Sequence, residues 1–425
     1  MRRTMYTAAI LAGFAATLVG SSGHAEPVAD AVDPLQDRHR NLIRLAVYID
    51  TLRANAEDAR LLPISADQDI PPRALLDSLR SWLPELASHH VLRKSFSRTI
   101  PRKHSRPKRI APALSAYITR FDEPAAYDPS ALPPTIFMPT VMPALMPTKG
   151  IWIQALTDSS KQKDREGIDG FESDGESISV GFDRSIASNV RTGVRYARTG
   201  TKVLSNRFGR DDLKSDEITA YTSLGSGRHS LSLNFSYSDH ETERVRPILI
   251  PTADSVRVVA LFSQINASQW ASTLSYGASF GSNAVRVSPF ASMTYANLTT
   301  DDYLEAGPGD LSLLVATDDE EQIVGAAGVG FGIDWVAGNW LMAPSLQFAI
   351  DHDFKADQTT TFTRIPGSDF GFESSGYSIQ KTRLRTGIGF TAIHIKGLSA
   401  YANVTIEHKR DYDYLGAIIG LQYDF

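Results

Sequence analysis

The chain has 425 residues, with 43 basic and 48 acidic side chains and a formal net charge of −5, and this length allows two or three domains. It contains no cysteine, which excludes disulfides and metal–thiolate sites. Its mean hydropathy of −0.18 does not exclude a membrane protein, because the alternating strands of a barrel dilute the apolar signal.

Residues 1–25 have the pattern of a secretory signal peptide. Two arginines form a basic start, 10–19 form a short apolar core, and small residues precede the end of the segment. We predict cleavage between Ala25 and Glu26 and therefore export by the Sec route. An uncleaved anchor is the alternative, although the apolar run is short for a membrane helix. No later run is apolar over the roughly 18 residues of a spanning helix, so any membrane domain is predicted to be a barrel.

Residues 26–120 are predicted to form a short, mainly helical segment with little core. Apolar residues recur at near-helical spacing in 34–62 and 71–96, and Pro84 interrupts the second run. Residues 93–109 then carry eight basic side chains and no acidic one. Such a run suits lipopolysaccharide phosphates or another polyanion, including a ligand on a host or on the envelope. A solvated linker is the competing interpretation, and the scarcity of aromatic residues in the run favours it.

Residues 121–148 are predicted to be an extended linker. Seven prolines between 124 and 147 prevent a regular helix and favour polyproline-like chain. The linker leads directly into the third part of the chain, and it is a candidate to thread the lumen of a barrel there.

Residues 149–425 consist of alternating strands and turns. Apolar residues alternate with small or polar ones in 177–183, 231–237, 273–280, 327–335, 383–390 and 414–425. Each run lasts about ten residues, the length of a tilted membrane strand. Short turns at 226–227, 338–339 and 396–397 contrast with long polar loops predicted at 158–175, 207–216 and 301–321. The pattern predicts an all-β, transmembrane antiparallel barrel. A soluble sandwich or propeller is the alternative, but it does not explain the apolar outer faces.

Several local patterns in this part are similar to those of a known family. They are Gly150-Ile151-Trp152, 179–184 (SVGFDR), Pro289-Phe290-Ala291, 303–307 (YLEAG), Pro344-Ser345-Leu346, His352-Asp353-Phe354 and 420–425 (GLQYDF). In this order they resemble the C-terminal translocator domain of classical autotransporters, the proteins of type V secretion. The resemblance implies a monomeric barrel of about 12 strands that delivers an N-terminal passenger to the cell surface. The chain departs from the family in its short, helical first part and in a proline-rich segment where a lumen helix is usual.

Two sets of residues are candidate functional sites. The alternation predicts charged side chains that face the lumen, where they either guide a threaded segment or pair with one another: Asp183, Arg191, Arg195, Glu217, Asp334, Arg383, Arg385 and Glu407. The ending Leu421, Tyr423 and Phe425 resembles the signal that the barrel-assembly machinery reads in outer-membrane proteins. The simpler interpretation of Phe425 is an aromatic anchor at the membrane interface.

No catalytic residue, cofactor or metal site is predicted. Asp239-His240-Glu241 and Asp351-His352-Asp353 contain metal-ligand types, but consecutive strand residues point to opposite faces and do not converge on one ion. No asparagine lies between Asn55 and Asn189, so the asparagine cyclisation by which some autotransporters release their passenger lacks its nucleophile.

These observations predict an autotransporter of the Gram-negative outer membrane. Its barrel is expected to sit among membrane lipid and lipopolysaccharide and to anchor residues 26–120 at the cell surface. A pore or channel with a periplasmic or lumen-plugging N-terminal segment is the alternative. A surface-displayed enzyme is the second, disfavoured by the lack of catalytic patterns.

Overall fold

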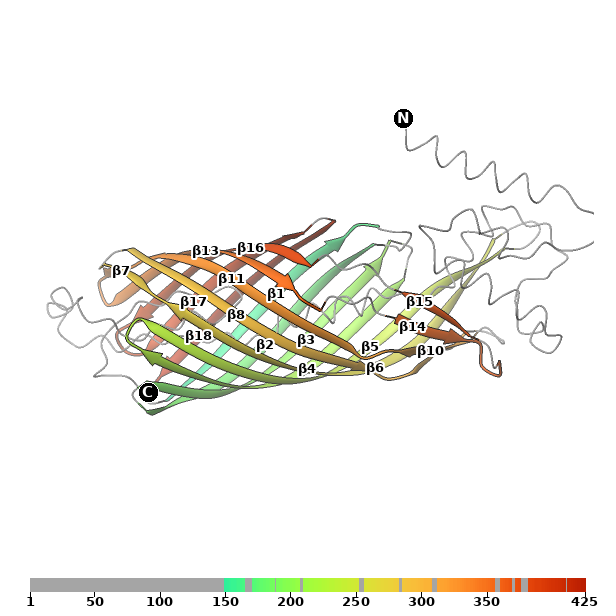
Figure 1. Cartoon of the computed structure of the whole chain (residues 1–425), viewed down its shortest axis with the longest axis horizontal. Coiled ribbons are helices and arrows are strands. Elements are labelled where there is room, and N and C mark those ends of the chain that lie inside the picture. The colour runs from blue at the N-terminus through green and yellow to red at the C-terminus, as the bar shows by residue number, and fades with distance from the viewer. Residues whose placement is uncertain are drawn as a thin grey trace, which may run out of the picture.

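The structure is a computed structural model, and the part of the chain that it describes is built from strands (Figure 1). The described residues are 149–425 without 165–169, 188, 207–208, 252–255, 283–284, 308–311, 356–359, 369–370, 376–380 and 410. The predicted signal peptide, helical segment, basic run and linker therefore lie outside them. Among the described residues, no helix is long and apolar enough to cross a membrane.

Twelve strands form a closed antiparallel barrel, as the sequence predicted. Each strand pairs with its neighbours along the chain, and closure comes from the pairing of the last strand with the first. The barrel strands are β1 (Lys149–Gln162), β2 (Phe171–Ala187), β3 (Val190–Ser205), β4 (Arg210–Ser226), β5 (His229–Pro251), β6 (Val256–Ala278), β8 (Val285–Thr300), β11 (Glu320–Ile333), β13 (Trp340–Asp353), β16 (Thr382–His394), β17 (Leu398–Lys409) and β18 (Tyr412–Asp424). Short β7 (Phe280–Ser282) and β12 (Trp335–Ala337) pair with β8 and β13.

The two chain ends of the barrel meet at its seam. The amide of Phe425 donates to the carbonyl of Lys149 at 3.0 Å, and the amide of Lys149 donates to the carbonyl of Phe425 at 3.3 Å. From there the register runs unbroken to Gln162 and Tyr412. Because every edge strand has a partner, the barrel leaves no open sheet edge to lipid.

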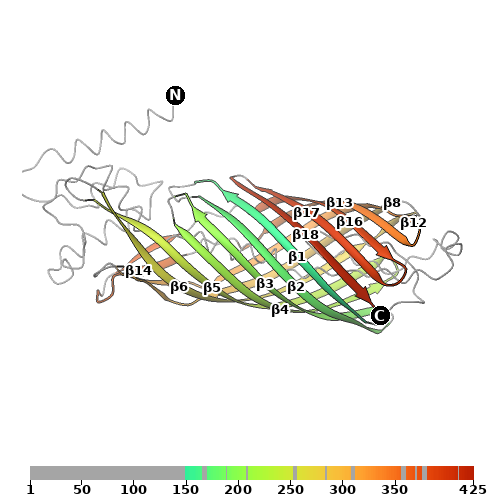
Figure 2. The same cartoon turned by 180° about the vertical axis from the view of Figure 1, so that it is seen from behind.

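The end of the barrel at which Lys149 and Phe425 meet also holds the short turns (Figure 2). The predicted turns at 226–227, 338–339 and 396–397 are confirmed as links between successive strands. Gly227 and Gly338 have φ of +58° and +61°, the left-handed conformation that tight hairpin turns require. In outer-membrane barrels this is the periplasmic end, and the longer connections belong to the extracellular end.

The long loops predicted from the sequence are wrong in extent. Residues 158–162 belong to β1 and residues 171–175 to β2, β4 begins at Arg210, and 301–321 contains two further strands. The strands continue beyond the membrane because ladder pairing requires only backbone groups, while the outward side chains change from apolar to charged. The change from apolar to charged outward side chains led to the incorrect prediction that loops begin there.

A second, four-stranded sheet stands at the extracellular end. Its order is β15 (Phe372–Ser375), β14 (Thr360–Arg364), β10 (Leu313–Thr317) and β9 (Tyr303–Glu305). It joins the barrel through paired main-chain hydrogen bonds of 2.8 and 2.9 Å between Phe262 of β6 and Ala306. Strands β5 and β6 contain 23 residues each, and Figure 1 shows the small sheet beside their far ends. We call this region, the small sheet with the distal β5–β6 hairpin, the extracellular extension.

Aromatic rings cover glycines on the lumen side of the wall. Trp152 lies over Gly181, Tyr221 over Gly193 and Tyr401 over Gly420, and a Cβ atom at any of these glycines would come within 2.3 Å of the ring. Gly328 is covered in the same way by Phe290. The absence of a side chain thus lets a large ring pack flat against the neighbouring strand.

Candidate functional site

The lumen wall formed by β2, β3 and β4 carries a buried polar cluster. Arg191 binds Asp183, with Nη2 and Oδ1 separated by 2.9 Å. The hydroxyl of Tyr221 donates to the same carboxylate at 3.4 Å and accepts from Trp152 Nε1 at 3.3 Å. Because β-strand side chains alternate, these residues share the inner face while Phe182 and Val194 face outward.

A second pair lies further along the same wall. Arg195 contacts Glu217, and both side chains are buried. The hydroxyl of Thr219 donates to the same Glu217 oxygen at 2.7 Å, and Ser238 reaches its other oxygen at 3.5 Å. Hydroxyl donors on β4 and β5 thus occupy acceptor positions that one arginine leaves open.

The opposite wall carries a three-strand cluster centred on Asp351 of β13. Arg383 Nε lies 2.6 Å from one carboxylate oxygen, and Arg385 Nη2 lies 2.9 Å from the other. Arg383 also reaches Glu407 of β17 at 3.5 Å. Two arginines therefore share two carboxylates across β13, β16 and β17. Arg383, Arg385 and Glu407 were among the charges predicted to face the lumen, whereas Asp351 had been considered only as a metal-ligand type.

Asp334 pairs with an arginine that the sequence analysis left out. Arg286 Nη2 of β8 lies 3.0 Å from Asp334 Oδ1, near the periplasmic end. Hence each of the eight charges predicted to face the lumen lies in an ion pair, and the structure groups them into four clusters. The alternation along each strand would have revealed the missing partners. Asp351 lies on the same inner face as Gln347, and Arg286 lies on the same inner face as Ser288.

The extracellular extension is attached by a cluster with no counterpart in the sequence analysis. Arg244 of β5 makes a bidentate pair with Asp211 of β4, with both nitrogen–oxygen distances at 2.9 Å. Its Nη1 donates to the hydroxyl of Tyr303 on β9 at 3.2 Å. Arg246 binds Glu305 on β9, with Nε 3.1 Å from Oε2. All five side chains are buried.

Burial determines the chemistry of this cluster. Tyr303 is buried among charged side chains, and burial raises the pKa of its hydroxyl, which therefore remains a neutral partner for Arg244. The arginine–carboxylate pairs fix β9 against β4 and β5 with directional bonds. Sequence gave little signal here, because the pairs join residues that are 33 and 59 positions apart.

His240 lies where the outer face of β5 changes from Tyr237 to Asp239. Its Nδ1 lies 2.7 Å from Ser215 Oγ and its Nε2 lies 3.0 Å from Gln269 Oε1. Burial lowers the pKa of the imidazole to about 4. Its sequence neighbours Asp239 and Glu241 face outward, away from the ring. Within the described part of the chain, no three acidic or histidine side chains are grouped so that they could hold a metal.

The terminal aromatic residues lie on the outside of the wall. Leu421, Tyr423 and Phe425 are about half exposed, and the rings of Tyr423 and Phe425 stack with centroids 6.2 Å apart. They stand on the same outward face as Ile419 and Leu415. This position suits an interfacial anchor.

A closed antiparallel barrel with an apolar outer belt and a polar, ion-paired lumen defines an outer-membrane β-barrel protein of Gram-negative bacteria. The family model described as autotransporter beta-domain matches residues 151–405. The chain belongs to this family, and its barrel is an autotransporter translocator domain, a domain without enzymatic activity.

Similar proteins agree with this assignment. The chain is 22% identical over 252 residues to outer membrane protein A of Rickettsia conorii and likewise to that of Rickettsia rickettsii. The match covers 58% of this chain and only 12% and 11% of those relatives, which are far longer.

Two solved structures share the fold. The translocator domain of autotransporter NalP from Neisseria meningitidis has 15% identity and a TM-score of 0.51, with 65% of this chain and 88% of that chain covered. The β-domain of the Bordetella autotransporter BrkA has 17% identity and a TM-score of 0.50, with 65% and 100% covered.

Proposed function

We propose that the barrel delivers residues 26–120 to the cell surface and holds them there through residues 121–148. The supporting observation is where the chain enters. Strand β1 begins at Lys149, beside Phe425 and at the end with the short turns, so the preceding chain meets the barrel from the periplasm. Since the wall is closed, the lumen is the route through it that the protein itself provides.

The linker is long enough for this route. A polyproline-like segment rises about 3.1 Å per residue, so residues 121–148 would span roughly 85 Å when extended. The 14-residue β1, tilted by about 40°, rises only about 35 Å along the barrel axis. The linker could therefore cross the lumen and present residues 26–120 outside.

The lumen lining supports passage of a polypeptide. Its charged side chains are paired within the wall, so a passing segment meets hydrogen-bonding groups without a strong field of one sign. We assign to Asp183, Arg191, Arg195, Glu217, Asp334, Arg383, Arg385 and Glu407 the role of keeping the wall polar and rigid around that segment.

The remaining assignments follow the same route. Residues 1–25 would direct Sec export with cleavage between Ala25 and Glu26, and the assembly machinery would read Leu421, Tyr423 and Phe425. The segment 26–120 is proposed to be non-enzymatic and to stay attached, with 93–109 contacting polyanions such as lipopolysaccharide. The chain has no asparagine between Asn55 and Asn189, which supports the proposal that the segment stays attached to the barrel.

Protease shaving of intact cells tests the proposal. An epitope inserted within residues 26–120 should be lost on treatment, while the same epitope in the periplasmic turn at 338–339 should persist. Survival of both epitopes in intact cells, with loss of both after outer-membrane permeabilisation, would overturn surface display in favour of a pore with a periplasmic segment. Conductance of the purified barrel with and without 121–148 then reports whether the linker occupies the lumen.

A further inference from the structure

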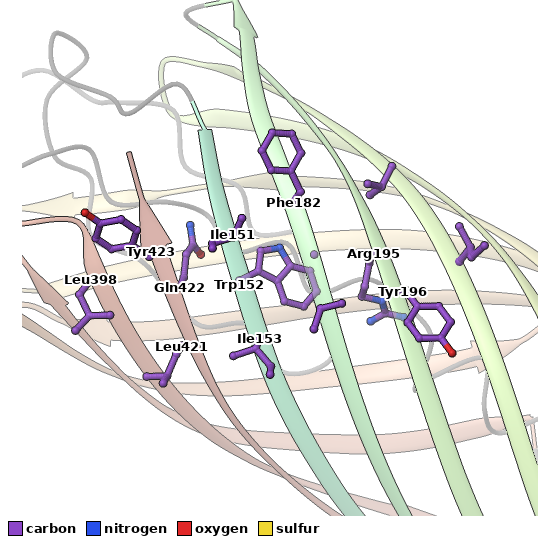
Figure 3. Close-up of a pocket in the computed structure, with 14 residues that line it drawn as sticks. Ile151, Trp152, Ile153, Phe182, Arg195, Tyr196, Leu398, Leu421, Gln422 and Tyr423 are labelled. Atoms are coloured by element: carbon purple, nitrogen blue, oxygen red, sulfur yellow. The ribbon is translucent and has the colours of Figure 1, made fainter.

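The outer surface of the barrel is hollowed beside the seam. A groove of about 740 Å³ crosses β1, β2 and β3, with a rim on β18 (Figure 3). We call it the seam groove; its walls are Ile151, Ile153, Val180, Phe182, Val194 and Tyr196. These walls are almost entirely apolar, and the groove opens outward, toward membrane lipid.

The strand register explains the hollow. Ile151 pairs with Phe182, and Ile153 pairs with Val180, so two columns of outward side chains stand next to each other. In Figure 3 the rings of Phe182, Tyr196 and Tyr423 stand around the shorter Ile151 and Ile153. Branched aliphatic side chains between larger aromatic ones leave a depression in the outer surface.

Two cations stand at the periplasmic end of this groove. Lys149 lies two residues before Ile151 on β1, and Arg184 lies two residues after Phe182 on β2. They are direct partners in the register, both are exposed, and both face outward with the groove residues. Neither forms an ion pair with another described residue.

Two of the lysines on the outer face at the other end of the barrel have acidic partners, whereas Lys202 there has no ion pair with a described residue. Lys161 pairs with Glu172, and Lys214 pairs with Glu243 at 3.1 Å. Those cations are compensated by acids on the neighbouring strand. The two beside the seam groove have instead an apolar channel on one side and the membrane interface on the other. This combination of positive charge and adjoining apolar surface is complementary to an anionic lipid.

We propose that the seam groove is a binding site for an anionic diacyl phospholipid of the periplasmic leaflet. One acyl chain lies along Ile153, Val180 and Val194, and the phosphate is bound by Lys149 and Arg184. Arginine and lysine donate charge-assisted hydrogen bonds to phosphate, and the paired positions place two such donors on one head group. The site rests on the membrane location of the barrel and is independent of what the barrel transports.

The seam position bears on the occupant. The rim residues Leu421 and Tyr423 belong to β18, and the walls belong to β1–β3, so the groove is complete only after β18 has paired with β1. A factor that acts on the unpaired last strand during assembly would therefore not find the complete groove. A lipid that stays bound to the finished barrel would find it.

Native mass spectrometry of the full chain in detergent provides the test. The protein is offered phosphatidylglycerol and phosphatidylethanolamine with identical acyl chains, and we expect about tenfold preferential retention of phosphatidylglycerol. The double variant K149Q/R184Q should reduce the preference to below twofold. The control R228Q/K202Q removes the same charge from a turn at the same end and from the far end of β3, and it should retain the preference.

A second variant tests the apolar half. Val180→Phe fills the groove and leaves both cations, so retention of phosphatidylglycerol should fall several-fold, whereas Leu233→Phe on the same outer face of β5 should not change it. Each variant is first shown to be folded by its heat-modifiable gel mobility. If K149Q/R184Q does not fold, Arg184→Gln alone takes its place.

Three outcomes would overturn the proposal. One is equal retention of the two lipids by the unchanged protein. Another is an unchanged preference in K149Q/R184Q or an equal loss in its control. The third is displacement of the lipid by inorganic phosphate at millimolar concentration, which would indicate an anion site without a role for the acyl chain.

Discussion

The membrane-embedded half of the barrel and the extracellular extension share strands β5 and β6 but differ in what holds them. On β5 the outward residues Leu231, Leu233 and Phe235 face lipid, and the outward Asp239, Glu241 and Glu243 face water. The ladder between β5 and β6 continues through both regions without a break. The backbone pairing is therefore the same on both sides of the membrane surface, and only the outward side chains mark where that surface lies.

The two regions use their inner faces differently as well. In the embedded half, buried ion pairs such as Asp183–Arg191 join adjacent strands that the ladder already holds. In the extension, Arg244 and Arg246 join β5 to β9, a strand outside the barrel ladder. We infer that ion pairs support a wall in one region and carry the attachment in the other. The predictions below test this difference.

The largest effect is expected from Arg244→Ala. It leaves the buried Asp211 without its bidentate partner, and breaking such a pair costs about 3–5 kcal/mol. The matched Arg210→Ala removes an exposed pair with Asp212 and should cost about 0–1 kcal/mol. Limited proteolysis should cut the four-stranded sheet in the first variant only, with the barrel still heat-modifiable. Equal resistance of both variants would mean that the ion pairs do not carry the attachment.

The next largest change in stability is expected when a charge is placed on the outer face of one strand, either within the lipid belt or beyond it. Val194 and Leu204 both face outward on β3, with exposed fractions of 54% and 55%. Val194→Arg puts a guanidinium into the lipid belt and should destabilise the barrel by about 2–4 kcal/mol, whereas Leu204→Arg beyond the belt should cost about 0–1 kcal/mol. Urea titration of each variant refolded in vesicles measures the difference. Similar costs at both positions would move the membrane boundary.

Strand glycines should differ between the inner and the outer face of the barrel wall. A Cβ atom at Gly420 would lie 2.1 Å from the ring of Tyr401, while one at Gly200 would have nothing within 4 Å. Gly420→Ala should therefore displace the ring, break its 3.0 Å bond to Gln154 and cost about 1–3 kcal/mol. Gly200→Ala should be neutral or slightly stabilising. The temperature at which the folded gel band disappears reports both, and a fall for Gly200→Ala would count against this packing argument.

The smallest effect is pH-dependent and arises at the boundary itself. His240 has a folded pKa of about 4, below its ordinary 6.5, so between these values the unfolded chain binds a proton that the folded chain does not. Stability should therefore fall as the pH drops from about 6.5 toward 4, by about 1–2 kcal/mol between pH 7 and pH 5. Comparing urea midpoints of the unchanged protein and His240→Gln isolates this contribution. An equally steep fall in His240→Gln would assign it to other groups.

The fold of the membrane-embedded half could be predicted from sequence because the pattern that it requires is local in the chain. Lipid outside and water inside require apolar and polar residues in strict alternation, as at Leu421 and Tyr423 against Gln422, and this repeat is visible in any ten residues. The same repeat placed the eight lumen charges on the inner face. Their ion-pair partners were only partly found. The alternation along a strand tells which face a residue occupies, but it does not tell which residue of the neighbouring strand lies opposite.

The extension was missed because its signals are not local. Leu314 and Phe362 belong to a sheet whose strands come from two separate connections. Arg244 meets Asp211 across the β4–β5 ladder and meets Tyr303 on β9, outside that ladder. Charged outward residues removed the alternation on which the strand prediction depended. The loops predicted at 158–175, 207–216 and 301–321 were wrong for this reason.

The sequence by itself determined that this protein is a membrane barrel, how its faces are oriented and which family it belongs to, because each of these follows from short repeats and motifs. Tertiary structure alone decided the ion-pair partners, the attachment of the small sheet and the seam groove between β18 and β3. Those features depend on which residues stand at the same height on different strands, and only the closed register of the barrel fixes that.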